Sequence, residues 1–451
     1  MSDENLLFDD IAPGMSYERS HIVTPNDFAL FAMLAGQDGE GDDARVPAVG
    51  AFPLISSSTI NFFPGNGSVV KDHHLDSHGW IRNGDTLGIE FTVKEKDAAS
   101  KQVVLDARLR NQNNEVLVSG PVTIIAPTRK HAATYAEPPQ LTLVQHRVFA
   151  ELRDRVDQEP PIPTAVVHPC DRESLTGAME AARANLIVPL LVGPEARIRE
   201  LADKEGIDLS GATIVDTPHS VASAAKAVEL CREGKAEAMM KGSLHTDEMM
   251  GAVVSSSTGL KCGRLISHVY VMDVPAYGRP LLVTDAAINI APTLEDKVHI
   301  VQNAINVAHV IGIDCPKVAI LSAVETVYPK MASTLDAAVL CKMADRGQIT
   351  GGVLDGPLAF DNAISMAAAK TKKISSPVAG QADILVMPNI ESANMVGKEM
   401  TYFAGAQTAG IVIGARVPIV LTSRADDVKT RMASTAVMAL VALANRSGKK
   451  V

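Results

Sequence analysis

The sequence of 451 residues predicts an α+β domain followed by a larger α/β region. Residues 1–133 contain one amphipathic helix and then three long strand-like runs, the pattern of an α+β domain. From residue 143 onward, short apolar strands alternate with amphipathic helices, which is typical of a parallel sheet with crossover helices. The stretch between them, 134–142, has no periodicity and contains a Pro pair, so we expect a linker.

The predicted helix of the N-terminal domain begins after Thr24. A hydroxyl at Thr24, a proline at Pro25 and an acid at Asp27 form a helix start. Phe28 and Phe31 then fall on one apolar face. Three strands are expected at 86–96, 101–111 and 115–127, with a tight turn at 113–114 between the second and third. A helix with a long antiparallel meander is therefore expected.

The region 143–451 holds ten strand-like runs, too many to expect in a single sheet. A helix is predicted over 293–312, because Val298, Val301 and Ile305 share one face. We therefore expect two α/β lobes with a cleft between them. Lobe one comprises 143–275 with 410–451, and lobe two comprises 276–409.

Composition excludes several classes of function. The 42 basic and 52 acidic residues give a net charge of −10, which argues against a nucleic acid as the main partner. The five cysteines lack CxxC spacing and are expected to be buried thiols of a reducing compartment. The sequence begins without a secretory signal, and no apolar run is long enough to span a membrane. A cytoplasmic protein is expected.

Polar residues follow many of the predicted strands. In open parallel sheets, ligands bind beyond the carboxyl ends of the strands. These residues are therefore candidates for substrate binding: Lys241, Asp285, Ser322, Asp355 and Asn394.

The segment PIVLTSRADDVKTRMAS, residues 418–434, runs from a buried strand into a helix. Arg424 is a candidate to bind a phosphate through two hydrogen bonds from its planar guanidinium. The start of the helix adds free backbone N–H donors, and a neighbouring carboxylate is a candidate base. In the alternative interpretation, Ser423 and Asp426 cap the helix and Arg424 forms a surface salt bridge.

Residues 160–445 resemble the phosphate acetyltransferase and phosphate butyryltransferase family. The resemblance is carried by four long stretches in the order in which that family has them. They are LLVTDAAINIAPTLEDKVHIVQNAINVAH, VAILSAVETVYPKM, GGVLDGPLAFDNAIS and AGIVIGARVPIVLTSRAD. The resemblance implies a two-lobed α/β phosphate acyltransferase fold with the site in the central cleft. It also implies the reaction of acyl-CoA with phosphate to give acyl phosphate and CoA, and a homo-oligomer.

The same resemblance implies roles at the 418–434 junction. Ser423 matches the family serine that stabilises the tetrahedral oxyanion, and Arg424 matches the arginine that binds phosphate. Asp426 and Asp427 are the candidates for the aspartate that deprotonates CoA. The family has a second arginine on the helix after KGSLHT, where this chain has DEMMGA; Arg264 is a candidate substitute.

The N-terminal domain resembles MaoC-like hot-dog domains, which include (R)-specific enoyl-CoA hydratases. FDDI from Phe8 to Ile11, the helix PNDFALFAMLAG and NGDTL carry this resemblance. Hydration needs an Asp and a His shortly after the helix. Asp38 matches the acid, but no histidine occurs between His21 and His73. We therefore expect this domain to serve assembly or acyl-CoA docking.

The function predicted from these features is phosphate acyltransferase, with acetyl as the preferred acyl group. Phosphate butyryltransferase is one alternative. A bifunctional enzyme with an active hydratase domain is another, and an impaired scaffold that only binds CoA is a third. The substrates are acyl-CoA, CoA, phosphate and acyl phosphate. Coenzyme A is a substrate, and this chemistry requires no metal or other cofactor.

Overall fold

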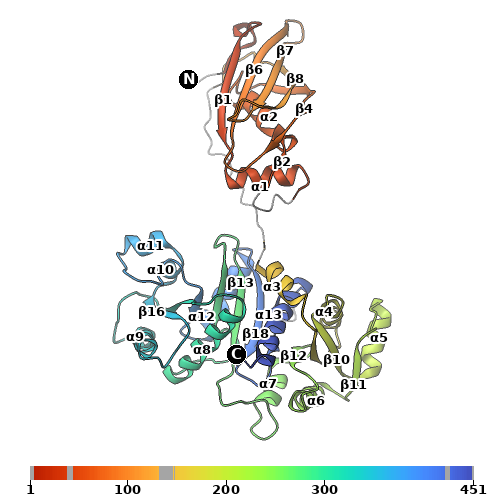
Figure 1. Cartoon of the computed structure of the whole chain (residues 1–451), viewed down its shortest axis with the longest axis vertical. Helices are drawn as coiled ribbons and strands as arrows, with labels where there is room; N and C mark the ends of the chain where they lie inside the picture. Colours follow the sequence, from red (N-terminus) through yellow and green to blue (C-terminus); the bar gives the residue numbers. More distant parts are fainter. Residues whose placement is uncertain (1–4, 38–43, 132–145, 147, 422–426, 449–451) are drawn as a thin grey trace. The chain divides into compact units, whose positions relative to one another are not determined.

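The computed structural model describes residues 5–37, 44–131, 146, 148–421 and 427–448. The chain divides into two compact units, 1–144 and 145–451 (Figure 1). The predicted linker, 134–142, lies outside the described residues. Within the described ranges, no helix is both long enough and apolar enough to cross a membrane.

Unit 1 is built on an antiparallel sheet. The order of its main strands is β1-β6-β7-β8-β3, and β4 also pairs with β8. The three predicted runs are confirmed as β6, β7 and β8, and Asn114 adopts a φ of 64° in the turn between the last two. The elements of unit 1 are η1 Phe8–Asp10, β1 Ser16–Ile22, α1 Pro25–Leu34, β2 Val46–Pro47, η2 Ala48–Ala51, α2 Phe52–Asn61, β3 Val69–His73, β4 Asp76–Ser77, β5 Trp80–Ile81, β6 Thr86–Asp97, β7 Gln102–Arg110 and β8 Val116–Ile125.

Helix α1 begins as its sequence predicts. The Thr24 side chain accepts the N–H of Asp27, and Asp27 accepts the N–H of Thr24 at 2.9 Å. Phe28 and Phe31 are buried, together with Ile55 of α2 and the inner residues of the sheet. An antiparallel sheet packed on helix α2 is the hot-dog arrangement that the sequence indicates.

In the described part of unit 2, the strands form one sheet, not two. Its eleven strands have the order β11-β10-β9-β12-β19-β18-β13-β14-β17-β15-β16. The predicted lobes are therefore two halves of a continuous sheet. The elements are α3 Val148–Val156, β9 Ile162–Val167, α4 Arg172–Arg183, β10 Ile187–Gly193, α5 Glu195–Glu205, β11 Thr213–Asp216, α6 Ser220–Arg232, β12 Ala238–Lys241, α7 Thr246–Val254, β13 Ser267–Asp273, β14 Pro280–Thr284, α8 Leu294–Val310, β15 Lys317–Leu321, α9 Ala332–Asp345, β16 Val353–Leu358, α10 Phe360–Ile364, α11 Met366–Thr371, β17 Ile384–Val386, α12 Ile390–Tyr402, β18 Gln407–Ile413, β19 Ile419–Val420 and α13 Val428–Arg446.

The sheet of unit 2 is not wholly parallel, which corrects the sequence prediction. Strand β18 is antiparallel to β19 and to β13, and β13 is antiparallel to β14. Strands buried on both faces read as apolar runs whichever way they point. The hydropathy pattern of the sequence therefore does not show which way each strand runs in the sheet.

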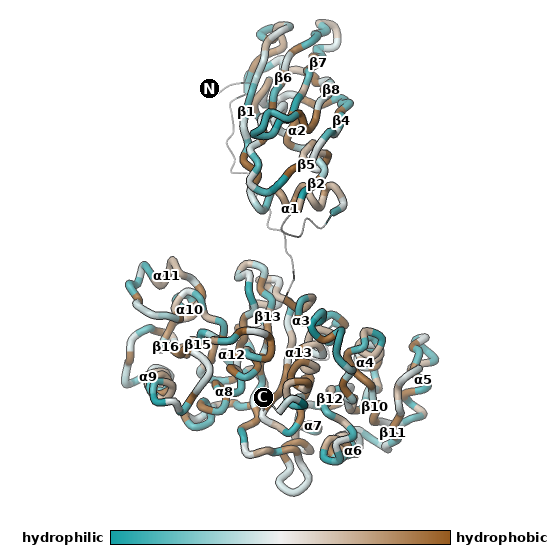
Figure 2. The backbone as a smooth tube through the Cα atoms, viewed as in Figure 1, coloured by the Kyte–Doolittle hydropathy of each residue, from teal (hydrophilic) through white to brown (hydrophobic). Residues whose placement is uncertain are grey.

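Helices cover both faces of this sheet, as expected for an α/β unit. One face packs against α3, α4, α5, α8, α9 and α13. The other packs against α6 and α7 over one half and α10, α11 and α12 over the other. Helix α13 is apolar along most of its length (Figure 2), and its residues from Ala433 to Ala442 are buried. It packs on β18 and on α3 and α4, so it ties the lobe-one strands together.

Candidate functional site

The predicted site residues lie at two opposite edges of the sheet. Strands β12 and β19 are parallel. Strand β18 is antiparallel to both of its neighbours, β19 and β13, so β13 points the same way as β12 and β19. Strand β14 points the opposite way. Because of these directions, the carboxyl ends of β12 and β19 lie along the same border of the sheet, the border formed by strand ends. This border is here named the β12 edge. The carboxyl end of β14 lies at the other, the β14 edge.

At the β12 edge, Lys241 ends β12 and is only 5% exposed. The backbone N–H groups of the next two residues donate hydrogen bonds to carbonyl oxygens at the end of the neighbouring strand, β9. The N–H of Gly242 donates to the oxygen of Val167, and that of Ser243 donates to the oxygen of His168, each at 2.9 Å. A Cβ at Gly242 would overlap both of those oxygens, so only glycine fits. The exits of β9 and β12 are therefore locked together.

His168 is a buried polar residue at this edge that the sequence reasoning missed. It has a left-handed φ of 54°, uncommon for a residue with a side chain. Its Nδ1 lies 3.2 Å from the hydroxyl of Ser223, which in turn contacts Thr217. Burial, followed by the charge of Arg197, lowers the pKa of His168. We expect it to be neutral near pH 7.

Asp171 lies at the same edge, close enough to Arg431 for the charge of Arg431 to act on its carboxylate. Asp171 caps α4, accepting the N–H of Ser174 at 2.8 Å. Burial alone would raise the pKa of Asp171, but hydrogen bonds from Ser174 and Ser243 and the charge of Arg431 together lower it. Arg431 lies on the first turns of α13 and is 4% exposed.

The sequence places the start of the last helix near Asp426, whereas α13 begins at Val428. Its N-cap is Asp427, whose Oδ1 accepts the N–H of Thr430 at 2.8 Å. Asp427 is exposed, and its second oxygen is not needed for the cap. The other three residues predicted at this junction, Ser423, Arg424 and Asp426, lie outside the described residues.

The β14 edge holds Asp285 and Asn394. The carboxylate of Asp285 accepts the N–H groups of Ala287 and Ile288 at 3.0 Å each and the side-chain amide of Asn289 at 2.6 Å. Burial raises the pKa of Asp285, against the effect of these bonds. Asn394 lies on α12, not at a strand exit, and donates to the oxygen of Ala286 at 3.1 Å. Both side chains hold the loop that follows β14.

Arg264 precedes β13 and therefore also lies at the β14 edge. Asn289 reaches the same place, donating to the oxygen of Ile266 at 2.9 Å. The Nη1 of Arg264 is buried without a hydrogen-bond partner. Because Lys241 and the first turn of α13 lie at the opposite edge, Arg264 is not in position to replace an arginine beside them.

The last two predicted residues have local roles. Ser322 directly follows β15, and its hydroxyl contacts that of Ser333 at 2.8 Å. Asp355 was expected after a strand but lies within β16, where its Oδ1 accepts the N–H of Gly356. The run GGVLDG ends in Gly, and that glycine marks a bulge in the ladder rather than its end.

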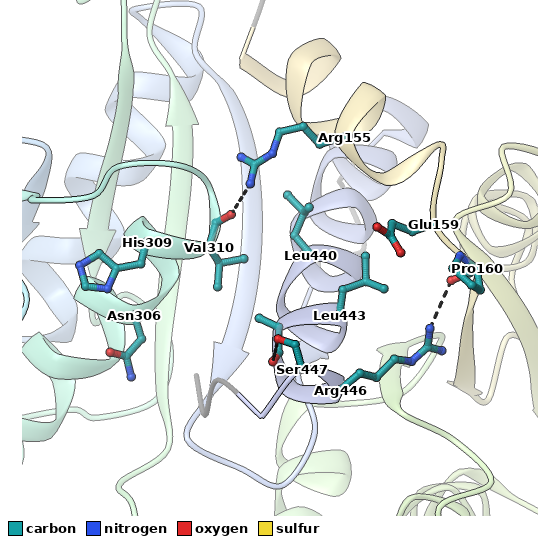
Figure 3. Close-up of a pocket in the computed structure, with 11 residues that line it drawn as sticks. Arg155, Glu159, Pro160, Asn306, His309, Val310, Leu440, Leu443, Arg446 and Ser447 are labelled. Carbon is teal, nitrogen blue, oxygen red and sulfur yellow. Dashed lines mark hydrogen bonds between the residues drawn. The ribbon is translucent and has the colours of Figure 1, made fainter.

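A pocket of about 860 Å³ lies elsewhere, between α3, α8 and α13 (Figure 3). Arg155 closes one side by donating to the oxygen of Val310 at 2.9 Å. Arg446 closes another by donating to the oxygen of Pro160 and by pairing with Glu237. None of the predicted site residues lines this pocket. Its arginines bind the ends of neighbouring elements together.

Comparison with known proteins agrees with the geometry of unit 2. The family described as phosphate acetyl/butaryl transferase matches residues 219–439. A phosphate acetyltransferase of Rhizobium meliloti is 60% identical over 291 residues, which cover 64% of this chain and 92% of that protein. A phosphate butyryltransferase of Clostridium beijerinckii is 44% identical over 298 residues, 66% of this chain and 99% of that protein.

A solved structure supports the same assignment. The branched-chain phosphotransacylase from Enterococcus faecalis V583 is 32% identical, with a TM-score of 0.55. The match covers 62% of this chain and 99% of that one. From residue 145 onward, the chain is therefore similar to these enzymes in fold and in sequence, and it belongs to the phosphate acetyl/butaryl transferase family.

Proposed function

We propose that the protein transfers an acyl group between coenzyme A and inorganic phosphate. The observation that carries the proposal is the 60% identity to a phosphate acetyltransferase over 291 residues. The identity to a butyryltransferase is lower, at 44%. Acetyl is therefore the proposed acyl group and butyryl the alternative.

The reaction places two substrates side by side. A phosphate oxygen attacks the thioester carbonyl, the C–S bond breaks, and CoA leaves as a thiol or thiolate. In reverse, the CoA thiolate attacks the acyl phosphate and phosphate leaves. Holding both reactants in one site makes this step effectively unimolecular. In this proposal CoA is consumed as a substrate, and no metal or other cofactor takes part in the reaction.

The β12 edge is the proposed position of the reacting groups. Lys241 ends the strand that pairs with β19, so it lies beside the start of the segment that contains Ser423 and Arg424. In the proposal, Arg424 binds phosphate and Ser423 stabilises the oxyanion. Asp426 or Asp427 receives the thiol proton. The residues at the β14 edge hold a loop at the opposite end of the sheet and are not proposed to bind phosphate.

The test is a direct assay of the full chain. Acetyl-CoA or butyryl-CoA is mixed with phosphate, and both the released thiol and the acyl phosphate are measured. Formation of the two products in equal amounts supports the proposal. Thiol release without acyl phosphate would indicate a thioesterase instead. Faster turnover with butyryl-CoA would select the alternative acyl group.

Two coarser expectations accompany this function. We propose a homo-oligomer, because exposed sheet edges such as β1 and β3 in unit 1 favour pairing between chains. Light scattering that gave the mass of a single chain at micromolar concentration would contradict it. The cytoplasmic location stays a prediction, to be tested by fractionating cells.

A further inference from the structure

Helix α12 presents a row of exposed side chains on its outer face. Its inner residues, Ala393, Val396 and Met400, pack in the core beneath the helix. The exposed residues recur every three or four positions, which places them along one face of the helix. They are Glu391, Met395, Lys398, Glu399 and Tyr402. This row is here named the α12 stripe.

Among the described residues, the three most exposed large apolar side chains lie on or beside α12. Phe403, directly after the helix, is 90% exposed and Tyr402 is 75% exposed. Ile290, at 72%, lies at the other end of the helix, because its carbonyl oxygen accepts the N–H of Ile390 at 3.1 Å. Met395 of the stripe is 63% exposed. Apolar side chains gathered in this way are typical of a surface that binds another protein.

Helix α12 is fixed on the sheet, so the stripe is preformed. Asn389 caps the helix by accepting the N–H of Ser392 at 3.0 Å. A Cβ at Gly397 would lie 3.1 Å from the ring of Tyr270, so the helix packs closely on strand β13. Binding to a fixed surface costs little conformational entropy.

The charges of the stripe match those of a second copy of the same stripe. In an antiparallel pair of identical helices, a twofold axis places each residue opposite a residue equally far beyond the axis. An axis between residues 398 and 399 sets Lys398 opposite Glu399 of the second copy. It also sets Met395 opposite Tyr402 of the second copy. An axis one turn earlier, at residue 395, would set Glu391 against Glu399, which is unfavourable.

The same register also pairs the apolar side chains at the two ends of the helix. In an antiparallel pair, the C-terminal end of one helix lies beside the N-terminal end of the other. Phe403 of one copy therefore approaches the end at which Ile290 of the other copy lies. A second copy thus supplies an apolar neighbour for the exposed apolar side chains and an opposite charge for both charged residues at the axis.

We propose that the α12 stripe is an interface between two copies of this chain, formed by two antiparallel α12 helices about a twofold axis between residues 398 and 399. The interface gives the proposed homo-oligomer a defined contact in unit 2, separate from the sheet edges of unit 1. It does not depend on the acyl-transfer activity.

Cysteine cross-linking of the full chain tests the register. Met395→Cys and Tyr402→Cys are introduced together, the chain is oxidised, and the disulfide-linked dimer is measured on a non-reducing gel. In the proposed register the new thiols of one copy lie opposite those of the other, so most of the chain should be linked. Either substitution alone should link no more than the unchanged chain. Identical positions would lie about 10 Å apart along the axis, too far for a disulfide.

Two controls set the background of the cross-linking. The unchanged chain has its own exposed thiols, Cys262 and Cys315. The matched control is Leu335→Cys with Lys342→Cys, two exposed positions seven residues apart on α9. Both controls should give the same low level of linked dimer.

Charge reversal in the cross-linking chain tests the contact at the axis. Lys398→Glu sets like charges against each other at two symmetric points, so the rate of linking should fall by about tenfold or more. Adding Glu399→Lys restores opposite charges in exchanged order, and the rate should recover. These positions are exposed, so melting curves should not change.

Three results would overturn the proposal. The first is a doubly substituted chain that links no more than the controls, which would leave the stripe to a different protein. The second is linking by Met395→Cys or Tyr402→Cys alone, which would indicate another register. The third is a rate that Lys398→Glu does not lower. If light scattering shows an oligomer while the α12 pair does not link, the proposed homo-oligomer stands and this contact fails alone.

Discussion

Asn289 donates its side-chain amide to the carboxylate of Asp285 at 2.6 Å, four residues away in the same loop. The N–H groups of Ala287 and Ile288 point at the same carboxylate. Asp285 therefore organises the turn that leads from β14 toward α8. A carboxylate with these hydrogen bonds stabilises the loop and is not available to bind a substrate. The first two predictions test this role.

Asp285→Ala should destabilise the protein without a specific effect on substrate binding. The change leaves the buried N–H groups of the loop without an acceptor, which typically costs about 1–3 kcal/mol each. We expect the free energy of unfolding in urea to fall by about that amount or more. KM for phosphate should stay close to the wild-type value. A raised KM with unchanged stability would return Asp285 to the substrate-binding residues.

Asp285→Asn should change how stability depends on pH. Burial raises the pKa of Asp285 in the folded protein. Its contribution is therefore complete below the ordinary pKa of an aspartate and is lost as pH rises through the raised value. An asparagine does not ionise, so the stability of the variant relative to the unchanged chain should improve as pH rises from about 3.5 toward neutrality. Urea unfolding at several pH values measures this, and a difference that does not vary with pH would contradict it.

The ion pair between Lys297 of α8 and Asp336 of α9 should contribute to stability. Their side chains lie 2.6 Å apart and are 7% and 25% exposed. Lys297→Met removes one partner of a mostly buried ion pair and should lower the free energy of unfolding by on the order of 3 kcal/mol. The loss should be smaller than for a fully buried pair, because Asp336 is partly exposed to water.

The exposed pair of Lys342 and Asp345 is the matched control for that change. Their separation is similar, at 2.5 Å, but the side chains are 67% and 62% exposed. Lys342→Met should change stability by less than about 1 kcal/mol. Equal losses in the two variants would show that burial is not what gives the Lys297 pair its effect.

The sequence predicted the elements of both units better than it predicted their directions. The capping residues of α1 and the apolar face of α8 are local, and both are confirmed. The antiparallel course of β13 and β18 is not local. A run such as SHVYVMD is buried on both faces and carries no alternation that would reveal its direction.

The same limit applies to the candidate site. The search for polar residues at the ends of predicted strands found Lys241. The same search at the strand before His168 would also have found His168 and Asp171. Arg431 required the structure, because its position depends on the contact between α13 and Gly177 of α4, far away in the sequence. A charged residue on the buried side of α13, in line with Ser434 and Thr435, was the one signal available.

The full chain should not hydrate crotonyl-CoA above background. In unit 1, His21 lies before helix α1 and its Nε2 contacts Asp27 at 3.1 Å. Asp27 also caps that helix through Thr24. No histidine follows until His73, and Asp38 lies outside the described residues. The absorbance of crotonyl-CoA tests this, and its ready loss with formation of 3-hydroxybutyryl-CoA would establish a second activity.

Arg424→Ala should lose turnover while the protein stays folded. Arg424 lies between Leu421, which continues the buried strand β19, and Asp427, which caps α13. In the proposed reaction, its contact to phosphate strengthens as charge develops on the leaving group, so it acts on the transition state as well as on binding. Removing one such donor typically costs about 10²–10³ in turnover. Arg424→Lys should recover only part of the loss, because an ammonium keeps the charge without the planar fork.

Arg416→Ala is the control, since Arg416 is exposed in the turn between β18 and β19. It should retain wild-type turnover. If Arg424 instead forms a surface salt bridge, its loss is worth roughly 0–1 kcal/mol of stability and turnover would hardly change. Acyl phosphate formation by the three variants, with melting curves to confirm folding, separates these outcomes. Turnover of Arg424→Ala equal to that of Arg416→Ala would remove Arg424 from the mechanism.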